Sequence, residues 1–485
     1  MSFFVYPFGT VKVSDYLRVG KKKGTFVQLF NRRKTMKKSL VFGAALLLAA
    51  PLAAQEFWEL DPRKADLEAG RIYRTEVIPY ALRHDAEARN RDKAGAVLPF
   101  APKEIGAIDA GRVAAAIVEI PFEWTDGLTY LHLENVGSAY SLYLNGALVA
   151  EVEDPLTPAE FHLSPLVVQG RNDFRLLLRP SDTPGIDPEP AVRRPPFAES
   201  YLYNQHKRSI RDFEIALVPD SMRRDGILEL KILALNGYNY DEKVEAGFDI
   251  YSPQGRLLDF NIREIPLPGR STDTVRFHPF IYHVNQNRWT ADTKTAPPVY
   301  RAMLFTRRDG TYREYMPLLL GFGRTEFAAG RLLRHDEVLQ LKRTRYNAAA
   351  DRKTTLAEVR ALKAKGFNTL CPDYPQPAWF YDLCTEQGLY VIDRAAIAAP
   401  ERRTDRRVGG TPSNDPALVG EYLERVKAMY YRSRNYPCVI AFALGAPSGN
   451  GYNMYKAYEW LKSVERHRPV LYEDAAGEWN SDTEE

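Results

Sequence analysis

Cysteine and histidine are scarce in this sequence. Three cysteines occur in 485 residues, Cys371, Cys384 and Cys438, all within the last third of the chain. An odd and sparse set of this kind gives neither a disulfide framework nor a cysteine-based metal site. The eight histidines are scattered singly, without the spacing of metal ligands. We therefore expect no bound metal and no cofactor.

The sequence shows no apolar run long enough to predict a membrane span. The apolar stretch Leu40–Ala50 is too short to cross a bilayer, and it follows Lys37 and Lys38. A charged start, a short apolar centre and a small-residue exit are typical of a secretory signal peptide. We expect residues 1–35 to be a spurious start or a disordered tail and residues 36–54 to be the signal peptide. The mature protein would then be periplasmic or secreted.

Basic residues do not dominate once this leader is set aside. The full sequence has a formal charge of +4, and the segment through Ala54 holds ten Lys or Arg residues and one Asp. Its removal changes the charge to −5. Proteins that bind nucleic acid usually present a basic patch. The sequence therefore predicts no nucleic-acid partner.

Short alternating strands fill residues 56–220 and, separately, residues 223–325. In the first segment Ala114–Ile120 is a predicted strand, and Asn145-Gly146 is a strong signal for a two-residue hairpin. This pattern predicts a jelly-roll β-sandwich, to which Ser209–Leu217 returns as a strand. The second segment, with a turn every ten residues or so, predicts an immunoglobulin-like β-sandwich.

The period of the apolar pattern changes from two to 3.6 after about residue 331. Thr355–Lys365 and Pro377–Gln387 are predicted helices, each followed by a glycine. Leu389–Ile392 is a continuous apolar strand of the kind that parallel sheets require. Alternating strands and helices through residue 485 predict an incomplete (β/α)8 barrel of TIM type. The expected fold class is thus multidomain β plus α/β.

The segment Pro437–Gly449 carries a family resemblance. It is a predicted buried strand that runs into a turn of small residues, the place where an α/β barrel positions its chemistry. It resembles the acid/base strand of glycoside hydrolase family 2, the β-galactosidase and β-glucuronidase family. Further segments resemble that family in the same order along the chain: Ser138–Gly146, Thr157–Phe161, Trp289–Asp292, Gly321–Arg324, Trp379–Cys384 and Gly388–Asp393.

The resemblance also implies which residues should carry the reaction. The family's retaining mechanism uses two glutamates about 5 Å apart, one protonating the glycosidic oxygen and one attacking the anomeric carbon. The acid/base position corresponds to Pro447 and its Asn neighbour to Ala446. Neither side chain can transfer a proton. The nucleophile is expected near a seventh barrel strand, beyond residue 485, which suggests a truncated chain.

Other family positions differ as well. Asp393-Arg394 stands where the family has two acidic residues, and Tyr203–Lys207 replaces the acidic loop expected between the first sandwich and the sugar. Asn145, Asp373 and Asp393 are the remaining candidates for substrate contact. A substitute pair of carboxylates could come from Asp373, Asp393, Glu473 and Asp474, which all lie near predicted strand ends. Trp289, Trp379 and Trp479 could stack on sugars.

Three functional hypotheses follow. The first is a catalytically silent relative of β-galactosidase that retains glycan binding. The second is an active exo-acting β-galactosidase-type hydrolase of O-glycosyl bonds, whose carboxylates come from unmatched positions. The third is a non-catalytic interaction module in a glycan-degrading assembly. All three predict a carbohydrate context, and an oligomer is compatible with each.

Overall fold

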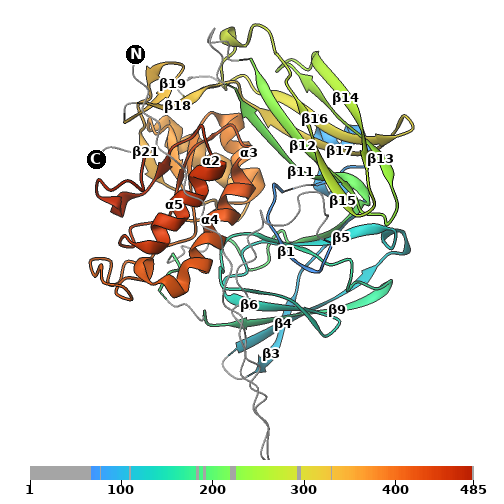
Figure 1. Cartoon of the computed structure of the whole chain (residues 1–485), viewed down its shortest axis with the longest axis horizontal. Coiled ribbons are helices and arrows are strands. Elements are labelled where there is room, and N and C mark those ends of the chain that lie inside the picture. Colours follow the sequence, from blue (N-terminus) through green and yellow to red (C-terminus); the bar gives the residue numbers. More distant parts are fainter. Residues whose placement is uncertain are drawn as a thin grey trace, which may run out of the picture. The chain divides into compact units, whose positions relative to one another are not determined.

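The computed structural model describes residues 67–482, apart from residues 77, 109–110, 182–184, 189–192, 219–225, 292–295 and 329. The predicted leader, residues 1–54, lies outside the described residues. Figure 1 colours the elements along the sequence, with the strands of the first third in blue and green and the helices of the last third in orange and red. The domain boundaries given above remain predictions.

Ten strands between residues 70 and 206 form two five-stranded antiparallel sheets. The first has the order β1 (Gly70–Ile72), β8 (Ala159–His162), β5 (Gly127–Leu133), β10 (Tyr201–His206) and β2 (Val97–Pro99). The second has the order β3 (Lys103–Ile108), β4 (Gly111–Ile120), β9 (Gly170–Arg179), β6 (Ala139–Leu144) and β7 (Ala147–Val152). Leu131 and Phe161 of one sheet share a buried cluster with Leu142 and Phe174 of the other, so the two sheets form a β-sandwich. A short helix, α1 (Arg83–Ala88), precedes β2.

The hairpin predicted at Asn145-Gly146 is confirmed. Strands β6 and β7 pair on either side of these two residues. Both adopt positive φ, 52° for Asn145 and 85° for Gly146. Asn and Gly are favoured in such a turn because they tolerate the left-handed conformation.

Seven further strands form a second pair of sheets. One has the order β11 (Arg208–Leu217), β12 (Leu228–Asn236) and β15 (Ser271–Phe277). The other has the order β14 (Leu257–Leu267), β13 (Glu242–Tyr251), β16 (Tyr300–Arg308) and β17 (Thr311–Leu320). Ile232, Phe248 and Leu304 lie in the buried cluster that both sheets share.

Two expectations about the first sandwich are wrong. Tyr203–Lys207 was expected to replace a loop, but Tyr203 to His206 belong to β10, which pairs with both β5 and β2. Ser209–Leu217 lies in β11, which pairs with β12 of the second pair of sheets and does not return to the first. The alternating pattern predicted Ser209–Leu217 as a strand, but it does not specify which sheet a strand joins, because pairing partners lie far away in the sequence.

The βα series predicted after residue 331 is confirmed. A small antiparallel sheet, β18 (Thr325–Ala328), β19 (Arg331–Arg334) and β20 (Glu337–Val338), leads into a five-stranded parallel sheet. Its strands, in sequence order, are β21 (Arg343–Arg345), β22 (Thr369–Cys371), β23 (Tyr390–Arg394), β24 (Val439–Ala443) and β25 (Val470–Leu471). The connecting helices are α2 (Arg352–Ala364), α3 (Ala378–Gln387), α4 (Val419–Ser433) and α5 (Tyr452–Val464).

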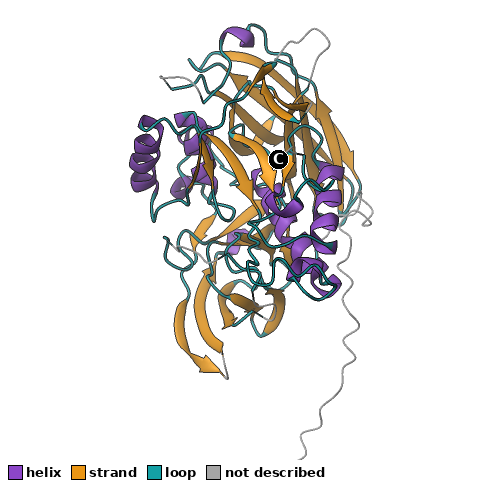
Figure 2. Cartoon of the chain, turned by 90° about the vertical axis from the view of Figure 1, so that its left-hand side faces the viewer, coloured by secondary structure: helices purple, strands orange, loops and turns teal. Residues whose placement is uncertain are grey.

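Local signals explain where these helices begin and end. The Asp351 side chain accepts a hydrogen bond from Thr354 N at 2.8 Å and caps the start of α2. Gly388 follows α3 with φ of 65°, the left-handed geometry that stops a helix. Figure 2 shows helices in purple and strands in orange. The helices α2 to α5, all ten residues or longer, connect the strands of the parallel sheet.

The two faces of the parallel sheet have different surroundings. Leu370, Val391 and Phe442 point into the large buried cluster that also contains residues of α2, α3, α4 and α5. Ile392, Ala441 and Ala443 form a small separate cluster with Leu341, Cys371 and Leu471. Because side chains alternate along a strand, this second set marks the inner face of the sheet.

Among the described residues, no helix is long and apolar enough to cross a membrane.

Buried polar contacts join the sandwiches to the helices. The indole of Trp289 is fully buried and donates to Thr385 O of α3 at 2.9 Å. Arg434 Nη2 donates to Asp212 Oδ2 of β11 at 2.6 Å. Trp289 is thus a junction residue and does not present its ring to a ligand.

Candidate functional site

The turn after β24 occupies the place where the sequence predicts the acid/base residue. Ala446 N donates to Ile397 O at 2.8 Å, and Ser448 Oγ donates to Ala446 O at 2.8 Å while accepting from Ala399 N at the same distance. Ala446 and Pro447 are partly exposed. The backbone of the turn is therefore held firmly, but these two residues offer no ionisable side chain.

Asp373 follows β22 and is held on both carboxylate oxygens. Arg345 Nε donates to Oδ1 at 2.5 Å, and Asn347 Nδ2 donates to Oδ2 at 2.7 Å. Asp373 N in turn donates to Asn347 Oδ1 at 2.9 Å. These hydrogen bonds hold the loops after β21 and β22 together. They also engage both oxygens of a carboxylate that is a candidate for substrate contact.

Asp393 lies on β23 and points away from the inner face. Its side chain is fully buried, and Tyr381 OH of α3 lies 3.0 Å from both carboxylate oxygens. Burial raises the pKa of Asp393 to about 6, although hydrogen bonds from Ser433 and Tyr381 act in the opposite direction. Its neighbours Ile392 and Arg394 take the inner side. A role for Asp393 in substrate contact stays a prediction, and its observed partners lie in the layer of helices.

Two more acidic residues follow β25. Asp474 accepts from Gly449 N at 2.6 Å and from Arg403 Nη2 at 3.1 Å, so it braces the turn after β24. Glu473 is 69% exposed, and its Oε1 lies 3.8 Å from Arg394 Nη2. Glu473 is consequently the more accessible of these two carboxylates.

Asn145 lies at the tip of the β6–β7 hairpin. Its Oδ1 accepts from Asp173 N at 2.9 Å, and its Nδ2 donates to Leu166 O and to Asn172 Oδ1, both at 3.0 Å. The side chain thus ties the hairpin to neighbouring loops. Its proposed sugar contact stays a prediction.

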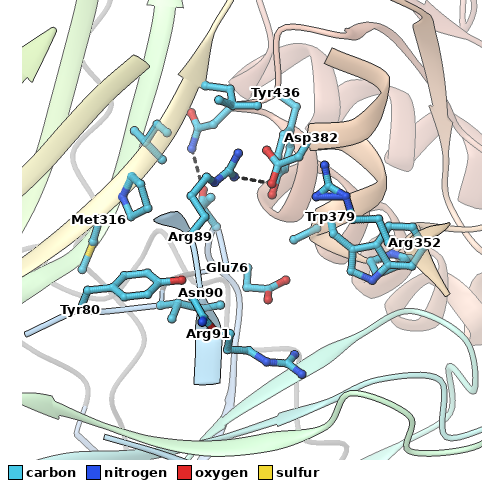
Figure 3. Close-up of a pocket in the computed structure, with 18 of the residues that line it drawn as sticks. Glu76, Tyr80, Arg89, Asn90, Arg91, Met316, Arg352, Trp379, Asp382 and Tyr436 are labelled. Atoms are coloured by element: carbon cyan, nitrogen blue, oxygen red, sulfur yellow. Dashed lines mark hydrogen bonds and ion pairs between the residues drawn. The ribbon is translucent and has the colours of Figure 1, made fainter. Parts of the chain in front are cut away.

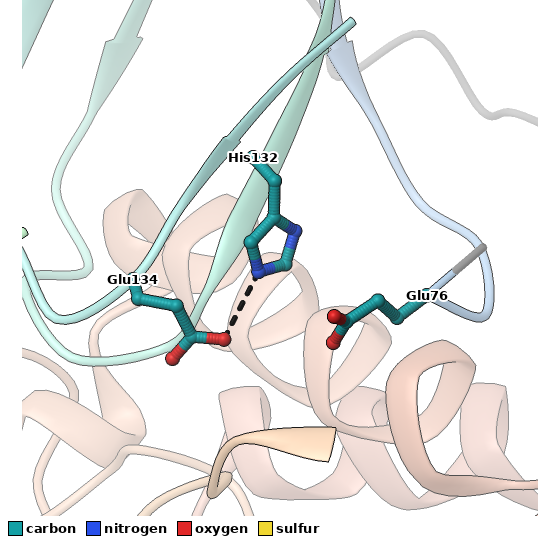
Figure 4. A group of neighbouring side chains, drawn as sticks. All are labelled: Glu76, His132 and Glu134. Carbon is teal, nitrogen blue, oxygen red and sulfur yellow. Dashed lines mark hydrogen bonds and ion pairs between the residues drawn. The ribbon is translucent and has the colours of Figure 1, made fainter. Parts of the chain in front are cut away.

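The structure brings together three residues that the sequence analysis did not connect. The side-chain nitrogen and oxygen atoms of Glu76, His132 and Glu134 that could bind a metal all lie within 4.8 Å of one another. Figure 4 shows the three side chains. His132 Nε2 is 2.9 Å from Glu134 Oε1. Arg432 of α4 also reaches the group: its Nη2 donates to Glu134 Oε1 at 2.7 Å, and its Nη1 lies 3.3 Å from Glu76 Oε2.

The charges in this group shift the pKa values of His132 and Glu134. Burial lowers the pKa of His132, but the carboxylates of Glu76 and Glu134 outweigh burial and raise it. Burial raises the pKa of Glu134, but Arg432, His132 and Arg194 hold it well below its usual range. A divalent cation here would have to approach the Arg432 guanidinium, which already balances the two carboxylates. We therefore interpret the group as a buried ion-pair network between the first sandwich and α4.

A cavity of about 620 Å³ adjoins this network. Figure 3 shows Glu76 and Arg91 on one side and Trp379 and Asp382 on another. Several of its charged groups are already paired: Arg89 with Asp382, and the Trp379 indole with Glu199 Oε2 at 2.7 Å. Trp379 thus has a partner within the protein. Trp479, in contrast, is 54% exposed and stacks on Tyr455.

Comparison with known proteins identifies the C-terminal part. Residues 341–484 match the TIM barrel domain of glycosyl hydrolases family 2. A β-galactosidase of Klebsiella pneumoniae is 28% identical over 364 residues, which is 72% of this chain and 34% of that enzyme. The chain belongs to glycoside hydrolase family 2. It spans about a third of the length of the curated relatives it matches.

Solved structures of two proteins described as glycosidases share this fold. A Bacteroides uniformis β-glucuronidase superimposes with a TM-score of 0.63 at 15% identity, covering 75% of this chain and 46% of that one. A Dictyoglomus thermophilum β-D-mannosidase gives a TM-score of 0.58 at 13% identity, covering 76% and 52%. These two likenesses show a shared fold. The family expectation drawn from the sequence motifs is confirmed by the match of residues 341–484 and by the β-galactosidase relatives.

The main residues that sequence reasoning missed are those of the ion-pair network. His132 and Glu134 are two residues apart, a spacing that places both side chains on one side of an extended chain. That local signal was present in the sequence. Glu134 and Arg432 are 298 residues apart, so no local pattern could have paired them.

Proposed function

We propose that this family 2 protein binds carbohydrate and does not hydrolyse unactivated glycosides. The observation that carries the proposal is the turn after β24, where Pro447 and Ala446 stand in place of the proton-transferring residue and its Asn neighbour. A glycosidic oxygen that receives no proton leaves slowly as an alkoxide. The family supplies the substrate class, a β-galactoside-like glycan.

The state of the nearby carboxylates supports this proposal. A substitute acid needs access to the ligand and a proton to transfer. Asp373 is held by Arg345 and Asn347, Asp393 is buried against α3, and Asp474 braces the turn. Glu473 is accessible, but two carboxylates are needed for the retaining reaction.

The finer assignments belong to the same proposal. We take the first sandwich as a jelly-roll sugar-binding domain, the second as immunoglobulin-like, and the mature protein as periplasmic or secreted. The two-sheet cores and the order of the three regions support the first two assignments. The leader-like sequence before Gln55 supports the third.

Two measurements on the purified chain test the proposal. A glycan array should show binding to β-linked glycans, and absence of any binding would overturn the carbohydrate assignment. A 2,4-dinitrophenyl β-galactoside needs no proton on its leaving group. Hydrolysis of this substrate without hydrolysis of alkyl glycosides would therefore agree with a missing acid. If Glu473→Gln abolished hydrolysis of a glycoside with an alkyl leaving group, Glu473 would be a working acid and the proposal would be wrong.

A further inference from the structure

Arg394 ends β23 on the inner face of the parallel sheet, beside the strand that leads to Ala446 and Pro447. It pairs in register with Ala443, and Ala395 N donates to Ala443 O at 3.1 Å. Its side chain is only 15% exposed. A largely buried guanidinium thus lies at the carboxyl end of the strands, where the proposed ligand would bind.

This guanidinium has no hydrogen-bond acceptor among the described residues. Its nearest carboxylate oxygens are Asp373 Oδ1 at 3.7 Å and Glu473 Oε1 at 3.8 Å, both beyond hydrogen-bonding distance. Arg394 Nε is enclosed and unbonded. A buried donor without a partner is unfavourable by roughly 1–3 kcal/mol, and more when it is charged.

The neighbouring acids cannot readily complete the missing bonds. Both oxygens of Asp373 already accept from Arg345 and Asn347. Glu473 is mostly in water. Arg394 and Arg343 act electrostatically on Cys371, and so do the carboxylates of Glu473 and Asp373, so this part of the inner face holds charges of both signs. Arg394 Nε is nevertheless left without an acceptor.

We infer that Arg394 binds an oxyanion at the carboxyl ends of the barrel strands, carried by a sugar ring as a carboxylate or a sulfate ester. A guanidinium presents parallel N–H donors that match either group, and such charge-assisted bonds are about twice as strong as neutral ones. This inference rests on the proposed carbohydrate function and narrows it to acidic glycans at this site. The Asp373 and Glu473 carboxylates would repel an anion that approached them directly. The negative group of the ligand must therefore lie against Arg394.

Calorimetric titration of the full chain tests the inference. The ligands are galactose, galactose 6-sulfate, galacturonate and inorganic sulfate. We expect at least one anionic sugar to bind at least tenfold more tightly than galactose and to weaken as salt is added. Arg394→Met should remove that tenfold preference, Arg394→Lys should keep part of it, and Arg407→Met, at an exposed site, should leave it unchanged.

The outcomes separate this inference from the proposed function. Equal binding of galactose and its sulfate, unaffected by Arg394→Met, would overturn the oxyanion site while leaving carbohydrate binding intact. Inorganic sulfate that binds as tightly as the acidic sugars, through Arg394, would support the site and assign it to a free anion. Because Arg394 has no hydrogen bond among the described residues, Arg394→Met should not lower the unfolding midpoint; a lower midpoint would mark it as a structural ion-pair residue.

Discussion

Arg432 is the residue that links α4 to the first sandwich by charge. It contacts Glu134 and Glu76, and all three side chains are at least nine-tenths buried. Removing one partner of a buried pair costs roughly 3–5 kcal/mol, because the other charge stays buried. We expect Arg432→Met to lower the free energy of unfolding in denaturant by about that amount. Arg407→Met, which breaks an exposed pair with Asp405, is the control and should leave the midpoint unchanged.

His132 should make stability depend on pH. It faces Glu76 and Glu134, lies near Arg432, and stacks on Tyr201. Since its folded pKa is raised above the ordinary value of about 6.5, its contribution is complete below that value and is lost as the pH rises through the folded pKa.

The variant His132→Asn isolates this contribution from other titrating groups. We expect the difference in unfolding free energy between the wild type and this variant to be largest near pH 5.5 and to shrink toward alkaline pH. Denaturant titrations at a series of pH values measure it. A difference that does not change with pH would show that folding leaves the pKa of His132 unshifted, and it would contradict this account.

At the scale of elements, the β6–β7 hairpin tests whether Asn145 serves the fold or the ligand. The Asn145 side chain makes three hydrogen bonds and the residue has positive φ. Asn145→Ala should therefore destabilise the protein by about 1–2 kcal/mol in denaturant. Glycan affinity should not change; a loss of affinity greater than tenfold at unchanged stability would make Asn145 a sugar contact. Asn145→Gly, which keeps the turn conformation, is the matched control for backbone strain.

The same elements show how far local sequence signals reach. The start of α2 could be predicted from the N-cap at Asp351, and the ends of α2 and α3 from Gly366 and Gly388, because capping is a property of adjacent residues. The sheet that β10 and β11 each join could not be predicted in the same way. β10 pairs with strands about 70 or more residues away, and β11 could have joined either of the two sandwiches. Helices were thus placed better than strand partners.

Those parts of the candidate site that directly follow a predicted strand could be predicted from the sequence. The turn after β24 and the acids after β22 and β25 were expected at strand ends, and they lie there. The side on which Asp393 points was not expected, because one residue of register decides whether a side chain faces the helices or the inner face. Arg394, its neighbour, takes the inner side as a result.

At the scale of the whole molecule, the chain combines the fold of family 2 with a strand-end turn in which Ala446 and Pro447 carry no ionisable side chain. Two β regions and a parallel βα sheet are joined by buried contacts at Trp289, Arg432 and Arg434. Those contacts involve neither Pro447 nor Arg394. Substitutions at Pro447 and Arg394 should therefore leave these contacts intact.

The most direct measurement is hydrolysis of methyl β-D-galactoside by the purified protein, because methanol cannot leave without a proton. The account predicts no free galactose above the level of a heat-inactivated sample, at any pH from 5 to 8. Galactose release that is proportional to protein concentration and co-purifies with the chain would contradict it.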